Sequence, residues 1–298
     1  MNAITLLENL RAVFYAPFYV AITRDFFRDE GLEVHFLPSP DPGDTLPRLL
    51  AGEVDVCWGG PLRVIRTHER NPECGLVCFN EVVGRDPFFL VGRRLQGEIS
   101  FDALRGKRVG VVSEVPTPWV CLRQDLADAG FDLSTMEVVT GRTMAENAAA
   151  LARGELDAFQ AFQPYVERAA AAPDCAVLYA AATRGPTAYT CFYTVRRTFD
   201  RNQAAFRALG RACQRAVRAV YEEGGAGIAD ALRQYFPDEP VELLGACVDR
   251  YVALGLYNPT GILPGEGFER LRRAMLGTGY IRRGASFTTC VDNRLFEE

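Results

Sequence analysis

Short apolar runs alternate with amphipathic segments through the first two hundred residues of the chain. Residues 4–9 form a mostly apolar run that predicts a buried strand. Residues 18–29 carry apolar side chains at helical spacing and are followed by Gly31, which predicts a helix closed by a glycine cap. Residues 32–37 and 54–58 are again strand-like, with a second helix between them. The order β-α-β-α-β predicts a parallel sheet with right-handed crossovers.

The same order of elements returns about a hundred residues later. Strands are predicted at residues 108–112, 136–139 and 156–160, with helices at residues 118–129 and 144–152. The peptide Ala51-Gly-Glu-Val-Asp55 matches Ala152-Arg-Gly-Glu-Leu-Asp157, and Gly31 matches Gly130. A repeated βαβαβ unit predicts two similar lobes.

The remaining segments predict how the two lobes are connected. Residues 87–91 and 190–194 read as strands that cross between the lobes. The rest of the chain reads as helices that pack on the first lobe, at residues 201–223, 227–235, 241–254 and 264–277. We therefore expect an α/β, two-lobed protein in which each lobe is a mostly parallel sheet flanked by helices. The first lobe comprises residues 1–88 and 195–298, and the second comprises residues 89–194.

Composition and charge argue against a membrane-spanning protein and against a nucleic-acid-binding protein. The chain has 298 residues, 48% of them hydrophobic and 24% charged, which is typical of a globular protein in water. No apolar run is long enough for a transmembrane helix. A net charge of −5 with scattered basic residues argues against a nucleic-acid partner. No leader pattern precedes the first predicted strand, so we expect a cytoplasmic location, or a periplasmic one if a leader has been removed.

Cysteine and histidine usage argues against metal or histidine chemistry. Nine cysteines, an odd number without a framework spacing, favour a reducing compartment. Cys74 and Cys78 have no second Cys/His pair nearby, so we expect buried or incidental thiols and neither a metal nor a cofactor. The only histidines, His35 and His68, lie outside any motif, so a histidine base is not expected.

Several motifs resemble one known family. They are Ala16-Pro-Phe-Tyr-Val-Ala21, Phe26-Phe27, Glu30-Gly-Leu-Glu-Val34 and Leu104-Arg-Gly-Lys-Arg-Val-Gly110, together with the two Gly-Glu-x-Asp peptides. Over about residues 4–200 the chain is similar to type II periplasmic-binding-protein folds of the aliphatic-sulfonate (SsuA) and thiamine-pyrimidine-precursor class. The resemblance implies a two-lobed substrate-binding protein such as those of ABC transporters.

A minority of that class are enzymes, and their chemistry is not carried over. Tyr15 stands where the pyrimidine-precursor synthase would have a histidine, and the cysteine-rich metal cluster of that synthase has no counterpart here. Residues 10–17 also lack the nucleophilic cysteine that the resemblance to an aromatic desulfinase would require. No catalytic residue is assigned.

The candidate ligand site follows from the sheet. Ligands of open parallel sheets bind beyond the carboxyl ends of the strands, which selects the loops at residues 9–17, 57–61, 80–86, 113–119 and 160–165. These loops are rich in aromatic and amide side chains, which suit a planar heteroaromatic ring. The candidate ligand-binding residues are Asn9, Arg11, Tyr15, Trp58, Gly59, Gly60, Asn80, Ser113, Thr117, Trp119, Gln160, Phe162, Gln163 and Tyr165.

Some of these residues have an equally good structural interpretation. Both tryptophans are as well suited to holding a loop against the core as to binding a ring. Thr117 is predicted as the N-cap of a helix that begins at Pro118, where free N–H groups either bind an anion or are simply capped. Arg11, Arg63 and Arg85 are counter-charges for an anionic ligand or members of surface salt bridges.

We expect a solute-binding protein that closes two lobes over a small aromatic or heteroaromatic ligand, pyrimidine-like or bearing a sulfonate or carboxylate. Its partners would be that ligand and, if the protein is exported, an ABC permease. The alternative is a cytoplasmic enzyme on the same fold that acts on a pyrimidine precursor or an aromatic acid. A detached ligand-sensing regulatory domain is disfavoured by the helical C-terminus.

Overall fold

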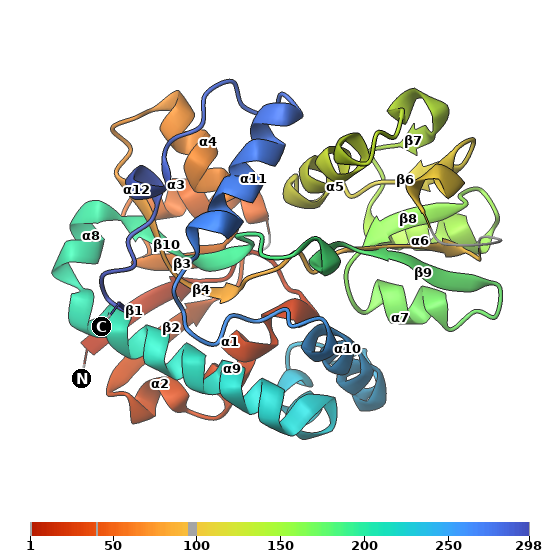
Figure 1. Cartoon of the computed structure of the whole chain (residues 1–298). Helices are drawn as coiled ribbons and strands as arrows, with labels where there is room; N and C mark the ends of the chain where they lie inside the picture. Colours follow the sequence, from red (N-terminus) through yellow and green to blue (C-terminus); the bar gives the residue numbers. More distant parts are fainter. Residues whose placement is uncertain (1, 40, 95–99, 298) are drawn as a thin grey trace.

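The computed structural model describes residues 2–39, 41–94 and 100–297. Residues 1, 40 and 298 of the predicted first lobe and residues 95–99 of the predicted second lobe lie outside it. Two five-stranded sheets, each flanked by helices, lie side by side (Figure 1). The strands are β1 Asn2–Leu7, β2 Leu32–Leu37, β3 Val56–Gly59, β4 Leu76–Val83, β5 Phe89–Arg93, β6 Arg108–Gly110, β7 Glu137–Val139, β8 Ala158–Ala161, β9 Cys175–Ala180 and β10 Thr190–Val195. The α-helices are α1 Ala16–Thr23, α2 Phe26–Asp29, α3 Thr45–Leu50, α4 Leu62–Arg70, α5 Thr117–Asp128, α6 Met144–Ala152, α7 Tyr165–Ala170, α8 Arg196–Arg201, α9 Gln203–Leu232, α10 Val241–Ala253, α11 Gly265–Gly277 and α12 Phe287–Cys290.

The two sheets have the same strand order. The first runs β2-β1-β3-β10-β4 and the second runs β7-β6-β8-β5-β9. In each sheet the three strands of the βαβαβ unit are parallel, and the fourth position holds a strand antiparallel to both of its neighbours. That fourth strand is β10 in the first sheet and β5 in the second. The predicted two-lobed α/β fold is confirmed.

The repeated Gly-Glu-x-Asp peptides perform the same structural task in both lobes. Gly52 and Gly154 adopt φ of 76° and 74°, a left-handed conformation that glycine takes with little strain, and each closes a helix. The following aspartates, which stand just before β3 and β8, then bind the backbone of a neighbouring strand, within β1 in the first lobe and at the start of β6 in the second. Asp55 Oδ2 accepts a hydrogen bond of 2.9 Å from the N–H of Thr5, and Asp157 Oδ2 accepts one of 2.8 Å from the N–H of Arg108. The sequence echo is therefore a repeat of local structure.

Two segments join the sheets. The first crossing leads from β4 to β5 through residues 84–88, and the second leads from β9 to β10 through residues 181–189. Figure 1 shows both running through the middle of the molecule. The predicted crossing strands thus become β5 and β10, and each ends up as the antiparallel member of the sheet that it enters.

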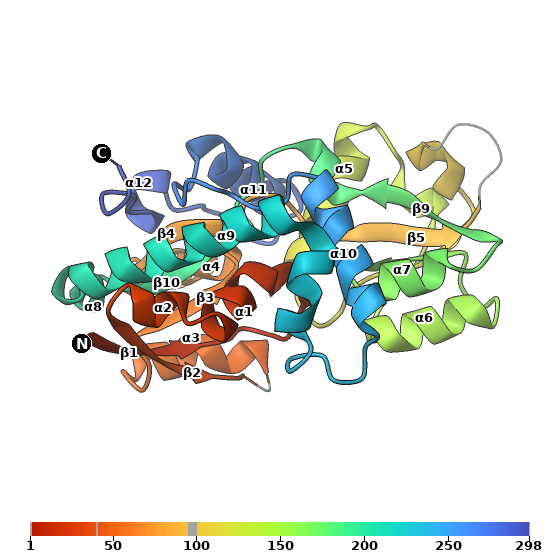
Figure 2. The ribbon, with the colours of Figure 1, turned by 90° about the horizontal axis from the view of Figure 1, so that it is seen from below.

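The C-terminal helices cover the first sheet, as predicted, and two of them also reach the second lobe. Helix α9 packs on α1 and α2, α10 lies between α9 and α7, and α11 packs against α4 and α5. Figure 2 shows α10 beside α9 with α7 on its other side. Tyr251 of α10 accepts a hydrogen bond of 3.0 Å from the N–H of Gln163 and donates one of 3.3 Å to the carbonyl of Pro87. The lobes are therefore held together outside the two crossings as well.

Several element boundaries differ from the sequence prediction. The helix predicted at residues 18–29 is two helices, because Asp25 has a φ of 57° and interrupts it. Gly224, with φ 62° and ψ −169°, interrupts α9 between the two helices predicted at residues 201–223 and 227–235. The short helices α8 and α12 carry too few periodic positions to be recognised, and strand β9 is a short apolar run without alternation. Within the described residues, no helix is at once long and apolar enough to cross a membrane.

Candidate functional site

A cavity of about 490 Å³ lies between the two lobes. Its walls are formed by Asn9, Leu10, Phe14, Tyr15, Asp41, Pro42, Gly43, Leu46, Gly60, Leu62, Arg63, Arg66, Thr67, Arg70, Phe88, Glu114, Val115, Pro116, Thr117, Phe162, Tyr189 and Tyr280. The first sheet contributes the loops after β1 and β3 and the helix α4, and the second contributes the loops after β6 and β8. The volume is in the range of small-molecule sites.

One part of the cavity wall is a cluster of aromatic rings. Phe14 and Phe162, one from each lobe, meet edge to face with their ring centroids 5.4 Å apart. Phe88 of the first crossing lies 5.2 Å from Phe162, and Tyr189 of the second crossing lies 6.0 Å from Phe14. Both lobes and both crossings therefore meet at one apolar surface, which suits the faces of a flat ring.

Polar groups stand beside these rings. Asn9 is 3% exposed, and its Oδ1 has no hydrogen-bond partner among the described residues. A buried acceptor of this kind is unfavourable unless something donates to it. Burial raises the pKa of the neighbouring cavity residue Tyr15 to about 12, so its phenol keeps its proton at neutral pH. The wall thus offers an open acceptor and a neutral hydroxyl.

Two helices begin at the cavity. Leu62 opens α4 on the first lobe and Thr117 opens α5 on the second, and neither helix start is capped by a side chain. Their N-terminal peptide groups add a positive field from both sides. Thr117, predicted as the N-cap, is instead the first residue of its helix, after Pro116.

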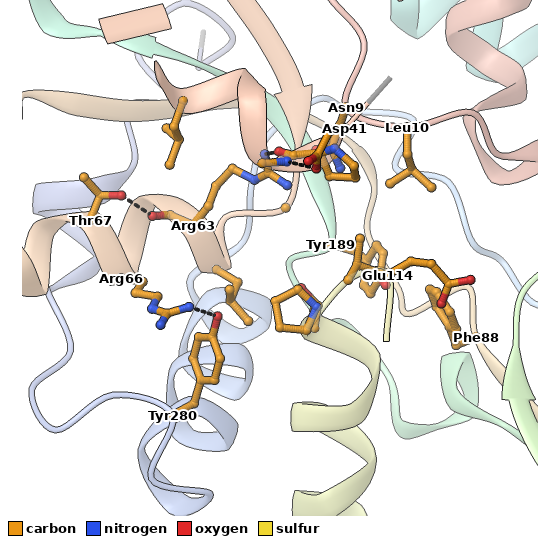
Figure 3. A pocket seen from close by; sticks show the side chains of 18 of the residues that line it. Asn9, Leu10, Asp41, Arg63, Arg66, Thr67, Phe88, Glu114, Tyr189 and Tyr280 are labelled. Carbon is orange, nitrogen blue, oxygen red and sulfur yellow. Dashed lines mark hydrogen bonds between the residues drawn. The ribbon is translucent and has the colours of Figure 1, made fainter. Parts of the chain in front are cut away.

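Three arginines follow along α4. Arg63 Nη1 donates to the carbonyl of Pro42 at 3.0 Å and to the Tyr193 hydroxyl at 3.2 Å, and it also contacts the Thr45 hydroxyl. Arg66 donates to the Tyr280 hydroxyl, with its guanidinium carbon 4.6 Å from that ring's centroid (Figure 3). Arg70 completes the row at the end of the helix.

The structure places five of the predicted site residues on the cavity wall. These are Asn9, Tyr15, Gly60, Thr117 and Phe162. All five lie at or just beyond the carboxyl end of a strand or at the start of the helix that follows. They come from both lobes, as the strand-end argument requires.

The other predicted residues of the first lobe lie away from the cavity wall. Trp58 is fully buried and stacks on Phe18, with a centroid distance of 4.3 Å. Gly59 is buried in β3, and Asn80 is buried in β4 with a φ of 45°. Arg11 pairs with Glu8, its Nη2 lying 2.8 Å from Oε2.

The remaining predicted residues of the second lobe form hydrogen bonds or packing contacts away from the cavity wall. Ser113 donates from its hydroxyl to the carbonyl of Arg142 at 2.7 Å, and Gln160 donates from Nε2 to the carbonyl of Pro118 at 2.8 Å. Gln163 Oε1 accepts a hydrogen bond of 3.0 Å from the N–H of Glu167 and so supports the start of α7. Trp119 packs against the core of the second lobe, and Tyr165 lies in a separate groove between α6 and α7.

Several wall residues were not foreseen from sequence. They include Phe88, Tyr189, Glu114 and Tyr280, together with Arg66 and Arg70. A signal for the arginines was present, since positions 63, 66 and 70 share one face of a helix that follows the third strand. Tyr280 stands beyond the last predicted helix, and nothing near it in sequence links it to the other walls.

The thiol and imidazole groups contribute little to this wall. Burial raises the pKa of Cys57 to about 12, so it is an unreactive thiol at neutral pH. His68 is buried with Nε2 2.8 Å from the carbonyl oxygen of Leu76, and neither histidine lines the cavity.

Two similar lobes, two crossings and a ligand-sized cavity between them define the class of two-lobed periplasmic-binding-protein folds. The chain belongs to the NMT1/THI5-like family, whose profile matches residues 14–224. Tyr280 and α10 to α12 lie outside that match.

Known proteins agree with this assignment. The chain is 23% identical to a Bacillus subtilis protein, YtlA, that carries the name of a binding protein, over 100% of this chain and 90% of that one. It is 26% identical to a 4-amino-5-hydroxymethyl-2-methylpyrimidine phosphate synthase of Schizosaccharomyces pombe, over 52% of this chain and 44% of the synthase. Among solved structures, the periplasmic aliphatic sulphonate binding protein SsuA of Escherichia coli superposes with a TM-score of 0.79 at 16% identity, covering 99% of both chains. The nitrate-binding protein NrtA of Synechocystis PCC 6803 gives 0.69 at 14% identity, covering 99% and 87%.

Proposed function

We propose that this protein is a substrate-binding protein of the ABC-transporter type, which closes its lobes over a small molecule with a planar ring. The observation that carries the proposal is the ring cluster of Phe14, Phe88, Phe162 and Tyr189. This ring cluster contains one residue from each lobe and one from each crossing. In this proposal the same rings therefore contact the ligand and connect the two lobes. A ligand held there would stabilise the closed arrangement.

The lobes that move in this proposal follow the division expected from sequence, residues 1–88 with 195–298 and residues 89–194, except that β10 moves with the first lobe because it is a strand of the first sheet. In this proposal Asn9 and Tyr15 form hydrogen bonds with polar groups at the edge of the ligand's ring. The buried Oδ1 of Asn9 has no partner among the described residues, which favours a ligand that donates a hydrogen bond to it. The names of the structural neighbours, which mention sulfonate and nitrate, support a small solute as the ligand. An ABC permease is the partner that this function requires when the protein is exported.

Mass spectrometry of compounds that remain bound to the purified protein tests this function. We expect one ring-bearing compound at close to one equivalent, and we expect it to be recovered unchanged after prolonged incubation. F162A should lose it, whereas Y165A, which alters the aromatic residue three positions later in the separate groove, should keep it. Conversion of the compound into a second one would contradict the proposal and favour an enzyme.

A further inference from the structure

One hydroxyl group of α10 binds the backbone beside two of the cavity rings. The Tyr251 hydroxyl accepts a hydrogen bond of 3.0 Å from the N–H of Gln163 and donates one of 3.3 Å to the carbonyl of Pro87. Gln163 directly follows Phe162, and Pro87 directly precedes Phe88. These two rings meet edge to face, with their centroids 5.2 Å apart. A single side chain therefore fixes the backbone next to two rings that contact each other.

The Tyr251 hydroxyl is suited to a permanent link between these two points. Its side chain is fully buried, so losing either partner would leave a polar group unsatisfied away from water. Burial also raises the pKa of Tyr251 well above its usual range, so the hydroxyl keeps the proton that it donates to Pro87. Both hydrogen bonds therefore persist at any pH at which the protein works.

Ion pairs hold α10 against the second lobe at the same place. Arg250, next to Tyr251, pairs with Glu167 of α7, with its Nη2 lying 3.2 Å from Oε2. Arg168, the next residue of α7, pairs with Glu239 just before α10. Figure 2 shows α10 between α9 and α7. The hydroxyl of Tyr251 is thus supported by charged contacts on both sides of the junction between the lobes.

Helix α10 also lies against a ring-bearing segment of the first lobe. It packs on the short 3-10 turn Val13–Tyr15, which carries Phe14. Phe14 in turn meets Phe162 with a centroid distance of 5.4 Å. The helix therefore contacts the segments that carry three rings of the cluster, and it lies beyond residues 14–224, which the family profile matches.

We propose that Tyr251 is a positioning residue that sets the spacing of the Phe88 and Phe162 rings and so gives the cavity its preference for a flat ring. This inference rests on the proposed function, whose site it shares, and adds a selectivity residue that does not contact the ligand. Phe88 belongs to the first crossing and Phe162 to the second lobe, so their spacing is not fixed by one rigid element. A gap of about 0.5–1 Å forfeits a quarter to a half of each van der Waals contact, so small changes in spacing alter selectivity.

Benzoate and cyclohexanecarboxylate are matched probes, because both have a six-membered ring and a carboxylate but only the ring of benzoate is flat. Titration calorimetry of the full chain should give benzoate an affinity about tenfold higher, as expected for one or two good aromatic contacts. Y251F removes the hydroxyl and leaves every cavity ring in place. We expect the preference for benzoate to fall to roughly twofold in this variant, because the rings no longer hold one separation.

Y221F is the matched control. The Tyr221 hydroxyl also donates one hydrogen bond and accepts one, of 2.8 Å and 3.0 Å, but both go to the backbone of Tyr257 in the first lobe, away from the cavity wall. Y221F and Y251F should both lower the temperature of thermal unfolding, yet Y221F should keep the preference for benzoate. R250Q, which loosens α10 from α7, should reduce the preference by a smaller factor and provides the test if Y251F does not fold.

A second measurement needs no bound probe. 4-Fluorophenylalanine in place of Phe162 reports the packing of that ring through its fluorine NMR resonance. Y251F should shift or broaden this resonance, because the ring loses its fixed position against Phe88. Y221F should leave it unchanged.

A Y251F protein that keeps the parent's preference for benzoate would overturn the inference, and so would a parent without that preference. An equal loss of preference in Y221F would overturn it as well, because any loosening of the protein would then have the same effect. If the parent retains a ring compound but binds neither probe, an unchanged fluorine resonance in Y251F overturns the inference. In all these cases the proposed function stands, whereas a protein that retains and binds no ring compound at all contradicts both.

Discussion

The guanidinium of Arg184 donates a hydrogen bond of 2.6 Å from Nη1 to Oδ2 of Asp86 and so ties together the two segments that cross between the sheets. The Asp86 side chain is 0% exposed and that of Arg184 is 8% exposed. Nε of Arg184 also donates to Asp125 of α5 at 3.0 Å, and Oδ1 of Asp86 accepts from the N–H of the cavity residue Phe88 at 3.0 Å. One buried cation therefore connects both crossings to two walls of the cavity.

Removing this cation should be costly. R184M would leave Asp86 and Asp125 facing each other without a counter-charge, and breaking a buried ion pair from one side typically costs about 3–5 kcal/mol. We expect a decrease of that size in the free energy of unfolding, measured by urea denaturation at neutral pH.

A second ion pair between the lobes serves as the control. Arg273 of α11 lies 2.6 Å from Asp128 of α5, but the two side chains are 64% and 46% exposed. Solvent screens such a pair, so D128N should change stability by less than about 1 kcal/mol. Equal costs for R184M and D128N would show that the crossings do not depend on the buried charge.

Trp58 should matter for stability and little for ligand affinity. Its ring stacks between Phe18, at 4.3 Å, and Phe36, at 5.3 Å, and it is fully buried. W58A should lower the free energy of unfolding by about 3–5 kcal/mol, as large-to-small core substitutions do.

W58F is the informative partner variant. It keeps an aromatic ring in the stack and removes an indole N–H that has no acceptor among the described residues. Its cost should therefore be well below that of W58A in the same denaturation experiment. A W58A protein with normal stability and weakened ligand binding would instead show that Trp58 belongs to the ligand site.

The fold was predictable because its signals are local and repeated. The Gly-Glu-x-Asp peptides specify a left-handed helix end and a carboxylate that binds the backbone of the neighbouring strand, and both lobes use them for the same purpose. Strand β9 was missed because its sequence is a short continuous apolar run, whose periodicity does not separate a strand from a buried helical segment, and because it belongs to neither repeated unit. Its place in the sheet depends on pairing with β5, which is distant in sequence.

The site was only partly predictable. Strand geometry explains which of the predicted residues line the cavity and which lie away from it. The strand-end rule identified the correct loops, but residues inside a strand alternate between its two faces. Trp58 and Gln160 are still inside β3 and β8 and point into the lobes, whereas Gly60 and Phe162 come just after those strands and reach the cavity. Tyr280 reaches the cavity because α11 packs on α4, a tertiary contact that no local sequence pattern predicts.

Asn9 should contribute to ligand affinity through its unpartnered Oδ1. N9A removes an acceptor that a ligand donor would satisfy, so affinity for the co-purified compound should fall by about tenfold or more, measured by calorimetry.

Asn80 provides the comparison within the set of predicted residues. It is buried in β4, away from the cavity, and its φ of 45° suits glycine, so N80G keeps the backbone geometry. We expect N80G to bind the compound normally. Weakened binding in N80G with normal binding in N9A would reverse the assignment of the two amides.

Glu81 should make the stability of the protein depend on pH between weakly acidic and weakly basic conditions. It is 1% exposed, and it lies near the start of the first crossing. Its Oε2 accepts a hydrogen bond of 2.8 Å from Asn258, while Oε1 has no partner in the described part of the chain. Burial raises its pKa to about 8, because the charged form loses its hydration.

The sign of the effect follows from the two states of the chain. The unfolded chain releases this proton near the ordinary carboxyl pKa of about 4.3, whereas the folded protein keeps it up to about pH 8. The stabilising contribution is therefore complete below about pH 4, decreases as pH rises, and is lost above about pH 8. In E81Q the amide oxygen can still accept from Asn258 but has no proton to lose. The stability difference between parent and E81Q, measured by urea denaturation across this range, should shift in favour of E81Q as pH rises and then level off. A difference that stays constant from pH 5 to pH 8 would mean that Glu81 ionises at its ordinary pKa and that water reaches it inside the first lobe.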